Sequence, residues 1–192
     1  MDNNSTQFSA GLASADEYDL LADRAAPDVA EMKVRSARKS KYKLQEITAD
    51  VFSQLLLQFC SQHGDFISNL KLQKLLYYSQ AWYLALHEKE LFPEPIEAWA
   101  NGPGLPEIYE KYREFGHRPI IQDCIELSVP KKITKHIEDV MKAYGHLSSY
   151  DLECISCEEE PWLGTRKRSG GNNDSVIPSD QMKNFYKLRI DV

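Results

Sequence analysis

The sequence lacks any uninterrupted apolar run of the roughly 18 residues that a membrane-spanning helix requires. Its first residues also lack the apolar core of a secretory signal. We therefore expect a cytoplasmic protein without a membrane partner. Four cysteines at uneven spacing do not form the framework of a small disulfide-rich secreted domain, and we expect reduced, partly buried thiols at Cys60, Cys124, Cys154 and Cys157.

Recognisable catalytic and metal-binding motifs are also absent. There is no G-x-S-x-G motif, no P-loop and no dinucleotide fingerprint. Cys154-x-x-Cys157 would need two more ligands for structural zinc, and the other cysteines offer no second local pair. The residues at 158–160, all glutamates, are interpreted as a solvated acidic patch. We expect no metal, no cofactor and no catalytic residue, and we expect surface or helix-end positions for His63, His87, His117, His136 and His146.

The chain is also short of positive charge. Its formal net charge is −6 over 192 residues. Non-specific binding to nucleic acid needs a basic face that releases counterions, so the composition argues against a nucleic-acid partner. Apolar residues make up 42% of the chain, which is enough for a hydrophobic core. A net negative charge favours solubility and association with a basic partner.

Residues 1–45 differ from the rest of the chain. Large apolar residues are sparse there, and an acidic part is followed by a basic run from Lys33 to Lys43. Such a segment buries too little surface to offset the entropy lost on ordering. We predict a mobile, disordered N-terminal arm over 1–45 and one folded domain over 46–192. The basic run is interpreted as a solvated linker, with a contact arm for a partner or nucleic acid, or a protease-recognition tag, as the alternatives.

The most informative stretch is an apolar helix followed by a proline-punctuated crossing. Between Leu75 and Leu86 only Ser79 and Gln80 are not apolar, so a helix over 69–88 is apolar on nearly every side. Other elements of the domain must then surround it. At ~1.5 Å per residue this helix measures roughly 30 Å, enough to cross a small domain.

Two polar residues of this helix need an explanation. Lys74 lies near its start, and we expect its ammonium group to reach solvent along the apolar stem. Gln80 lies deeper, where a buried amide needs hydrogen-bond partners. We expect it to bind the crossing segment in the neighbourhood of Trp99, with a direct contact to a partner protein as the alternative.

Capping residues and apolar periodicity predict further helices over 48–63, 106–116 and 130–144, a short one from Ser148, and a last one capped by Ser179. A short edge strand is predicted within 94–100, with partner strands from 119–121 and 124–127. Residues 101–104 are interpreted as a turn. The predicted fold class is mainly α (α+β), a compact helical domain around a buried central helix with a small β-hairpin or edge-strand element.

The central helix and the crossing resemble the Panacea domain, also called the SocA-like antitoxin domain, over about residues 48–188. The first half of the family pattern matches Leu72, Lys74, Leu75, Tyr78, Gln80, Trp82 and Leu84. The second half matches Phe92, Pro95, Ile96, Ala98, Trp99, Gly102, Pro103, Ile108 and Tyr109, and a looser match follows at Leu152, Pro161 and Trp162. We interpret as structural the motif residues Leu72, Lys74, Tyr78, Gln80, Trp82, Gly102, Pro103 and Trp162. The resemblance implies an antitoxin of a bacterial, phage or prophage-associated toxin–antitoxin pair.

Three departures from the family pattern are visible. Gly104 stands where the pattern usually has valine, and we expect it to loosen a turn. Ser156 and Cys157 stand where relatives often have Thr-His, so any chemical role of that histidine is missing here. The N-terminal arm is too short of apolar residues to form the DNA-binding helix-turn-helix that some relatives carry, so promoter binding is not expected.

The aromatic residues favour recognition over reaction. Interfaces use tryptophan and tyrosine as rigid anchors. Tyr109, Tyr112 and Phe115 cannot share one narrow helical stripe, so at least one should be exposed, beside nearby glutamates. We predict an acidic face suited to a basic toxin, with partner contacts from Trp99, Asn101, Glu107, Tyr109, Glu110 and Tyr112.

The leading hypothesis is neutralisation of a cognate protein toxin by direct binding. One alternative is an adaptor that delivers the toxin to an ATP-dependent protease of the ClpX–ClpP type. Another is an enzyme with an unrecognised site around Gln80, Trp99 and Asn101. A phage-encoded regulator of a host protein is a further alternative. The sequence leaves the identity of the toxin and the oligomeric state open.

Overall fold

A computed structural model of the protein describes residues 47–122 and 129–190. The predicted arm over 1–45 and the predicted strand over 124–127 lie outside these residues, so both stay predictions. Within the described ranges, no helix combines the length and apolarity needed to cross a membrane.

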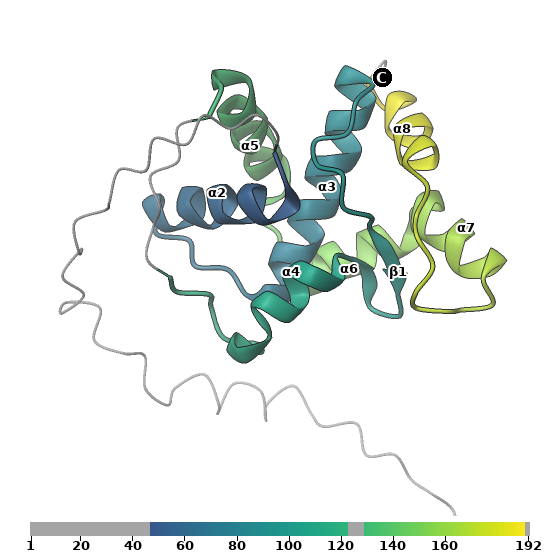
Figure 1. Ribbon diagram of the computed structural model, residues 1–192, viewed down its shortest axis with the longest axis horizontal. Coiled ribbons are helices and arrows are strands. Elements are labelled where there is room, and N and C mark those ends of the chain that lie inside the picture. Colours follow the sequence, from purple (N-terminus) through teal and green to yellow (C-terminus); the bar gives the residue numbers. More distant parts are fainter. Residues whose placement is uncertain (1–46, 123–128, 191–192) are drawn as a thin grey trace, which may run out of the picture. The chain divides into compact units, whose positions relative to one another are not determined.

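The described elements are mainly helices, with one short hairpin (Figure 1). In chain order they are α2 (Ala49–Gln62), α3 (Asn69–His87), β1 (Glu97–Trp99), β2 (Gly102–Gly104), α4 (Pro106–Lys111), the 3-10 helix η2 (Arg113–Phe115), α5 (Lys131–Tyr144), α6 (Ser149–Glu158), α7 (Glu160–Arg168) and α8 (Ser179–Lys187). The predicted class, mainly helical with a small β element, is confirmed.

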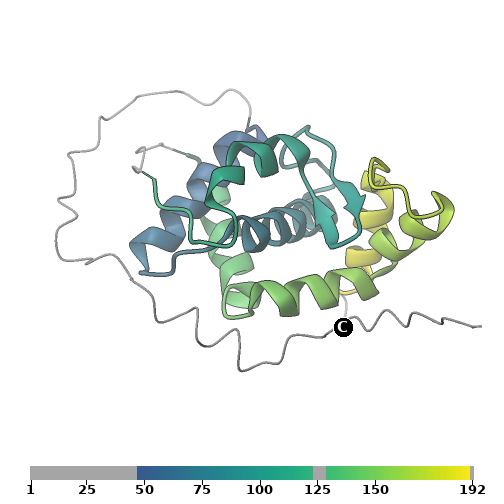
Figure 2. The same ribbon diagram turned by 90° about the horizontal axis from the view of Figure 1, so that it is seen from below.

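Helix α3 is the centre of the fold. It runs through the middle of the other elements in two perpendicular views (Figure 1, Figure 2), and it packs against α2, α4, α5, α6, α8 and β2. Its apolar side chains are buried around almost its whole circumference: Leu72, Leu75, Leu76, Tyr77, Tyr78, Ala81, Leu84 and Ala85. Burying each large apolar side chain stabilises the fold by roughly 1.5–3 kcal/mol. The prediction of a surrounded central helix is confirmed.

Side-chain caps begin three of the helices as the sequence predicts. The hydroxyl oxygens of Thr48 and Ser68 accept hydrogen bonds from the first turns of α2 and α3. Ser148 and Asp151 form a reciprocal capping box at α6. The predicted cap of α8 is wrong, because Pro178 is its N-cap and the Ser179 hydroxyl donates to Glu90 Oε1 at 2.7 Å instead.

The hairpin differs from the prediction. β1 pairs antiparallel with β2, with Glu97 opposite Gly104 and Trp99 opposite Gly102. Residues 102–104 are therefore a strand and only the preceding residues form the turn. Gly104 packs beneath the Trp99 ring, since a Cβ atom there would lie 2.4 Å from Trp99 Cζ3. Its missing side chain makes room for the indole rather than loosening a turn.

The other predicted strand partners are also wrong where they can be tested. Pro119 forms a bridge with Ser68, and Ile120 N donates to the Ile67 carbonyl at 2.9 Å, so this segment pairs with the entry to α3. The free edge of β1 is occupied by a later segment instead. Ala98 N donates to the carbonyl of Ser175 at 2.8 Å. The proline and glycine residues predict the position of the turn to within a few residues. They do not indicate that the segment at Ser175 pairs with β1.

Gln80 fastens the start of the crossing segment to α3. Its Oε1 accepts hydrogen bonds from Leu91 N at 2.8 Å and Phe92 N at 3.3 Å, and its Nε2 donates to the Phe92 carbonyl at 2.9 Å. The predicted bond to the crossing segment is present, but it lies at 91–92 and not near Trp99. All of these groups are buried, so each needs its partner.

Two polar residues expected at the surface are instead enclosed. Glu159 accepts hydrogen bonds from the hydroxyls of Tyr77 and Tyr186, and its partial burial raises the pKa of its carboxyl group. His136 is buried between α5 and α3, where its Nε2 lies 2.8 Å from the Ser79 carbonyl oxygen. Burial lowers the pKa of this imidazole. The surface position predicted for His136 was therefore wrong, and the solvated patch at 158–160 was wrong only for Glu159, since Glu158 and Glu160 are exposed. Sequence spacing does not show which helix faces meet.

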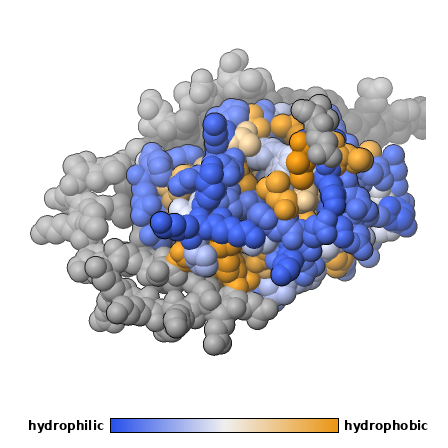
Figure 3. All heavy atoms as spheres, turned by 90° about the horizontal axis from the view of Figure 1, so that it is seen from above, coloured by the Kyte–Doolittle hydropathy of each residue, from blue (hydrophilic) through white to orange (hydrophobic). Residues whose placement is uncertain are grey.

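An apolar groove lies beside the C-terminal half of α3, with a volume of about 240 Å³. Its lining residues include Trp82, Leu86, Val140, Ala143 and Ile190. Seen from above, where the C-terminal end of α3 points, hydrophobic atoms are exposed among hydrophilic ones (Figure 3). Trp82 is fixed there by a 2.8 Å hydrogen bond from its Nε1 to the Tyr144 hydroxyl. This groove shares no lining residue with the pocket described in the next section.

We predict that Gln80→Met lowers the free energy of unfolding by about 2–4 kcal/mol, because two backbone N–H groups and one carbonyl lose their partners in the core. Urea denaturation measures this change. Gln62→Met, at the exposed end of α2, is the matched control and should stay within about 0.5 kcal/mol of the wild type. Equal losses for the two variants would show that the Gln80 bonds contribute nothing specific.

Candidate partner-binding pocket

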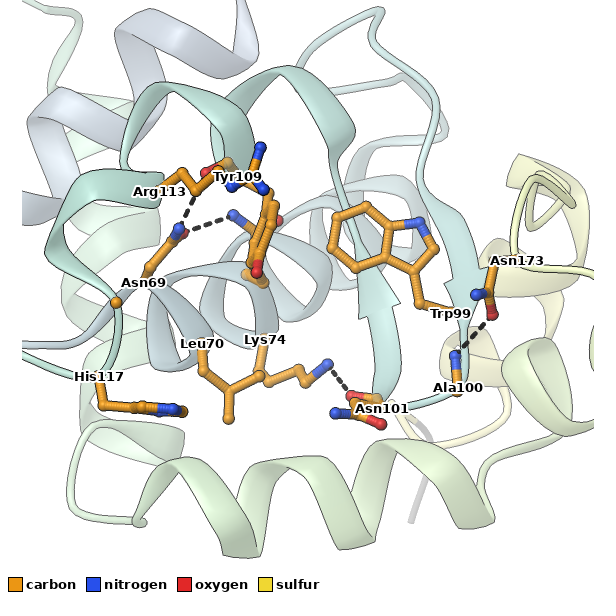
Figure 4. A pocket seen from close by; sticks show the side chains of 12 residues that line it. Asn69, Leu70, Lys74, Trp99, Ala100, Asn101, Tyr109, Arg113, His117 and Asn173 are labelled. Carbon is orange, nitrogen blue, oxygen red and sulfur yellow. Dashed lines mark hydrogen bonds between the residues drawn. The ribbon is translucent and has the colours of Figure 1, made fainter.

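A pocket of about 490 Å³ opens between the first half of α3, the β1–β2 hairpin and α4 (Figure 4). Asn69, Leu70, Gln73 and Lys74 of α3 form one side. Trp99, Ala100 and Asn101 of the hairpin form a second side, and Asn173 lies beside them. Tyr109 of α4, with Arg113 and His117 after it, completes the wall. These groups come together because the hairpin folds back over α3.

Lys74 lies at the base of this pocket and is 1% exposed. Its Nζ donates hydrogen bonds to the carbonyl oxygens of Asn101 and, at 3.1 Å, Pro103. The expectation that Lys74 reaches solvent is therefore wrong. The hairpin surrounds the ammonium so closely that a Cβ atom at Gly102, where φ is +91°, would lie 2.7 Å from Nζ. A glycine is required at that position for both reasons.

The burial of Lys74 changes its proton affinity. Loss of water around the ammonium lowers the Lys74 pKa to about 8, while the charges of Glu153 and Cys157 act in the opposite direction. The group is still mostly protonated at pH 7. A buried charge without full hydrogen bonding is costly, so the two carbonyls hold both the charge and the hairpin.

A ladder of amides stands beside Lys74. Gln73 Nε2 donates to Asn69 Oδ1 at 3.1 Å, and Asn69 Nδ2 donates to the Tyr109 carbonyl at 2.9 Å. Gln73 Oε1 accepts from Leu105 N at 2.8 Å. Together these bonds fix α4 and the end of β2 to α3. Sequence reasoning missed Asn69 and Gln73; their signal was two amides at i, i+4 spacing on a helix with almost no exposed face.

Trp99 is held rigidly over the opening. Its Nε1 donates to Glu97 Oε2 at 2.7 Å, and its carbonyl accepts from Trp162 Nε1 at 2.9 Å. Its ring meets the Tyr109 ring edge to face, with centroids 5.3 Å apart and an interplanar angle of 80°. Tyr109 is 42% exposed. Two fixed aromatic rings therefore border a hollow that is open to other molecules.

The residues expected to contact a partner fall into three groups. Trp99, Asn101 and Tyr109 line the pocket. Glu107 and Glu110 are exposed on α4 but do not line it. Tyr112 is buried, and its hydroxyl has no hydrogen-bond partner within the described residues. Tyr112 therefore belongs to the core and is not available on the surface for a partner contact.

The motif residues interpreted as structural lie largely in the core or hold the hairpin. Buried among them are Leu72, Lys74, Tyr78, Gln80, Gly102 and Pro103. Trp82 and Trp162 are half-buried and donate their indole hydrogen bonds to Tyr144 and to the backbone of Trp99.

Comparison with known proteins agrees with the resemblance seen in the sequence. The family model described as "Antitoxin SocA-like, Panacea domain" matches residues 72–163, a span that includes the hairpin and α4. The chain is 30% identical over 131 residues to Antitoxin SocA of Caulobacter vibrioides, an alignment that covers 62% of this chain and 70% of that protein. No solved structure matches.

We predict a pH-dependent stability difference between the wild type and Lys74→Met. The folded-state pKa of Lys74, about 8, lies below the ordinary lysine pKa of 10.5, so between these values the unfolded chain binds more protons. Relative to the variant, the unfolding free energy of the wild type therefore rises with pH in this window, by roughly 1–3 kcal/mol. Denaturation curves at pH 7, 8, 9 and 10 measure the difference between the two proteins. A constant difference across this range would contradict a buried, destabilised ammonium.

Proposed function

The chain belongs to the antitoxin SocA-like, Panacea-domain family, and we propose that it is an antitoxin that neutralises a cognate protein toxin by binding it directly. The surface proposed for binding is the pocket mouth formed by Trp99, Asn101 and Tyr109, together with the neighbouring carboxylates of Glu107 and Glu110. We call this set the hairpin face.

The observation that supports this proposal most is the rigid aromatic pair at the pocket mouth. The Trp99 indole and carbonyl are fixed by hydrogen bonds, and the Tyr109 ring packs edge to face on the indole, so a partner would immobilise little additional side-chain freedom on contacting them. Tyrosine and tryptophan at the edge of a hollow are typical energetic centres of protein interfaces.

The exposed carboxylates beside the pocket fit the same role. Glu107 and Glu110 lie on the outer side of α4, one turn apart. Such rim charges speed the encounter with a partner of opposite charge and favour one orientation of docking. A basic surface on the toxin would therefore be attracted to this side of the molecule.

The enzyme alternative has one feature in its favour, since the pocket holds Trp99, Asn101 and a lysine of lowered pKa. Gln80, however, does not line the pocket. Lys74 is fixed by two backbone carbonyls, and no aspartate, glutamate, serine or cysteine is among the described residues that line the cavity. The titratable lining groups Tyr109 and His117 make no hydrogen bond to Lys74 in the described part of the chain, so the pocket holds no nucleophile paired with a base, whereas a binding role uses its aromatic and donor groups.

The direct test is co-expression with the small protein encoded next to this chain. The proposal expects rescue of growth from that protein's toxicity and a complex that co-elutes in size-exclusion chromatography. Absence of both a complex and rescue would contradict the proposal. Toxin half-life separates blocking from delivery to a protease, because blocking leaves the half-life unchanged and delivery shortens it.

We predict that Tyr109→Ala weakens toxin binding about tenfold or more, because it removes an exposed aromatic anchor from the hairpin face. Isothermal titration calorimetry of the purified pair measures the change. Tyr150→Ala is the matched control, since Tyr150 is exposed at the start of α6 and outside this face. Similar affinities for both variants would place the interface elsewhere.

We further predict that reversing both charges, Glu107→Lys with Glu110→Lys, slows association about tenfold at low salt and less at high salt. Stopped-flow or surface plasmon resonance gives the rate. The double variant Glu138→Lys with Glu158→Lys, exposed on α5 and at the end of α6, is the control for the same change of net charge. An unchanged association rate for the double variant would reject the acidic rim as a steering element.

A further inference from the structure

The charged groups that line the pocket are cationic, whereas the chain as a whole carries a net negative charge. The formal net charge of the protein is −6, yet its ionisable lining groups, beside the Tyr109 phenol, are Lys74, Arg113 and His117. No carboxylate is among the described residues that line the cavity. The glutamates of the hairpin face lie outside it. The hollow therefore offers hydrogen-bond donors, while the exposed carboxylates lie on the outer side of α4.

Lys74 is the principal donor. An ammonium group has three N–H bonds, and two of those of Lys74 are directed to backbone carbonyls. The side chain is 1% exposed, lines the cavity and makes no third hydrogen bond to the described residues, so its remaining donor can be reached from the pocket. Because this charge has lost its water, an anion placed in the pocket would interact with it more strongly than with a lysine at the surface.

The orientation of the Asn173 side-chain amide adds a second hydrogen-bond donor to the pocket. Asn173 Oδ1 accepts hydrogen bonds from Ala100 N at 3.0 Å and from Arg166 Nη1 at 2.8 Å. These two donors fix its oxygen, which leaves the Asn173 amino group as a donor without a partner in the described part of the chain. The side-chain amide of Asn101, exposed at the hairpin turn, also makes no hydrogen bond to the described residues.

Arg113 adds a donor that can be redirected. Its Nη1 lies 3.2 Å from Glu110 Oε1, with both side chains mostly exposed. Exposed ion pairs of this kind contribute roughly 0–1 kcal/mol. An incoming anion can therefore compete for the guanidinium at little cost.

We propose that the pocket receives the carboxylate of a glutamate or aspartate side chain of the partner protein. The ammonium of Lys74 and the amides of Asn101 and Asn173 would donate to the carboxylate, while the aromatic rings pack on the methylene groups behind it. This inference rests on the proposed function for the identity of the partner. It adds that the toxin surface, basic where it meets the rim, carries one acidic anchor.

A protein carboxylate fits this pocket better than a nucleic-acid phosphate. A phosphate backbone brings many charges along an extended line, and it would meet the carboxylates of Glu107 and Glu110 beside the pocket mouth. A single acidic side chain brings only one charge. The cavity volume of about 490 Å³ is ample for a side chain with its flanking backbone.

The first experiment needs no toxin. The full chain, with 15N-labelled tryptophan indoles, is titrated with N-acetyl-glutamate methylamide, whose only charge is the side-chain carboxylate. The inference expects a saturable shift of the Trp99 indole signal in the millimolar range, and at least tenfold weaker binding of the isosteric N-acetyl-glutamine methylamide. Equal binding of the two compounds, or no saturable shift, would overturn it. Inorganic phosphate binding as tightly would overturn the assignment to a carboxylate.

Asn101→Asp makes the site-specific test. It keeps the size of the side chain and the backbone carbonyl that Lys74 uses, but adds a negative charge at the pocket mouth. We expect at least fivefold weaker binding of the glutamate probe, since a like charge within several ångströms disfavours the anion. Asn184→Asp, exposed on α8, is the matched control and should leave probe binding unchanged. Thermal melts of both variants verify that each is folded.

The same variants applied to the toxin complex separate this inference from the proposed function. If the wild-type chain does not bind the toxin, the antitoxin role fails while the result with the glutamate probe stands. If the wild type binds and Asn101→Asp binds equally well, the carboxylate pocket fails while the antitoxin role stands. Stronger toxin binding by Asn101→Asp, with weaker binding by Asn101→Lys, would show that the pocket takes a cation and would also overturn the inference.

Discussion

The structure depends on one buried ammonium. Lys74 joins the central helix to the hairpin through the carbonyls of Asn101 and Pro103. A buried ammonium without hydrogen-bond partners is costly, so the folded chain must place both carbonyl oxygens against Lys74 Nζ. Gly102 allows the close approach, and the glycine at 104 allows the Trp99 ring to lie flat on the strand behind it. The motif residues of the crossing are thus parts of one arrangement that holds the hairpin against α3.

This arrangement explains how a short hairpin can be a firm surface for recognition. Two-stranded ribbons are marginal by themselves, but here both edges are occupied. The amides of Asn69 and Gln73 attach α4 and the end of β2, and Trp162 binds the backbone at Trp99. The result is a preorganised opening with aromatic walls, cationic groups inside and carboxylates on the outer side of α4. Preorganisation of this kind favours binding because little order remains to be created on association.

Sequence reasoning predicted the parts that depend on local chemistry. The central helix, its serine cap, the capping box of α6 and the helical class follow from apolar pattern and hydrogen-bonding side chains, and all are present. The failures share one cause. Lys74, His136 and Glu159 were assigned to solvent because each is polar, yet their surroundings are set by elements distant in the chain. The strand partner of β1 and the amide ladder of the pocket also depend on contacts between distant segments, which the spacing of residues in the sequence does not indicate.

We propose that the hairpin face is the surface by which this protein holds its toxin. Hydrogen–deuterium exchange of the chain, alone and in complex with the product of the neighbouring gene, tests it most directly. We expect new protection concentrated over 97–117, from β1 through the end of α4 and η2. Protection confined to the apolar groove between α3 and α5, with exchange at 97–117 unchanged, would contradict it.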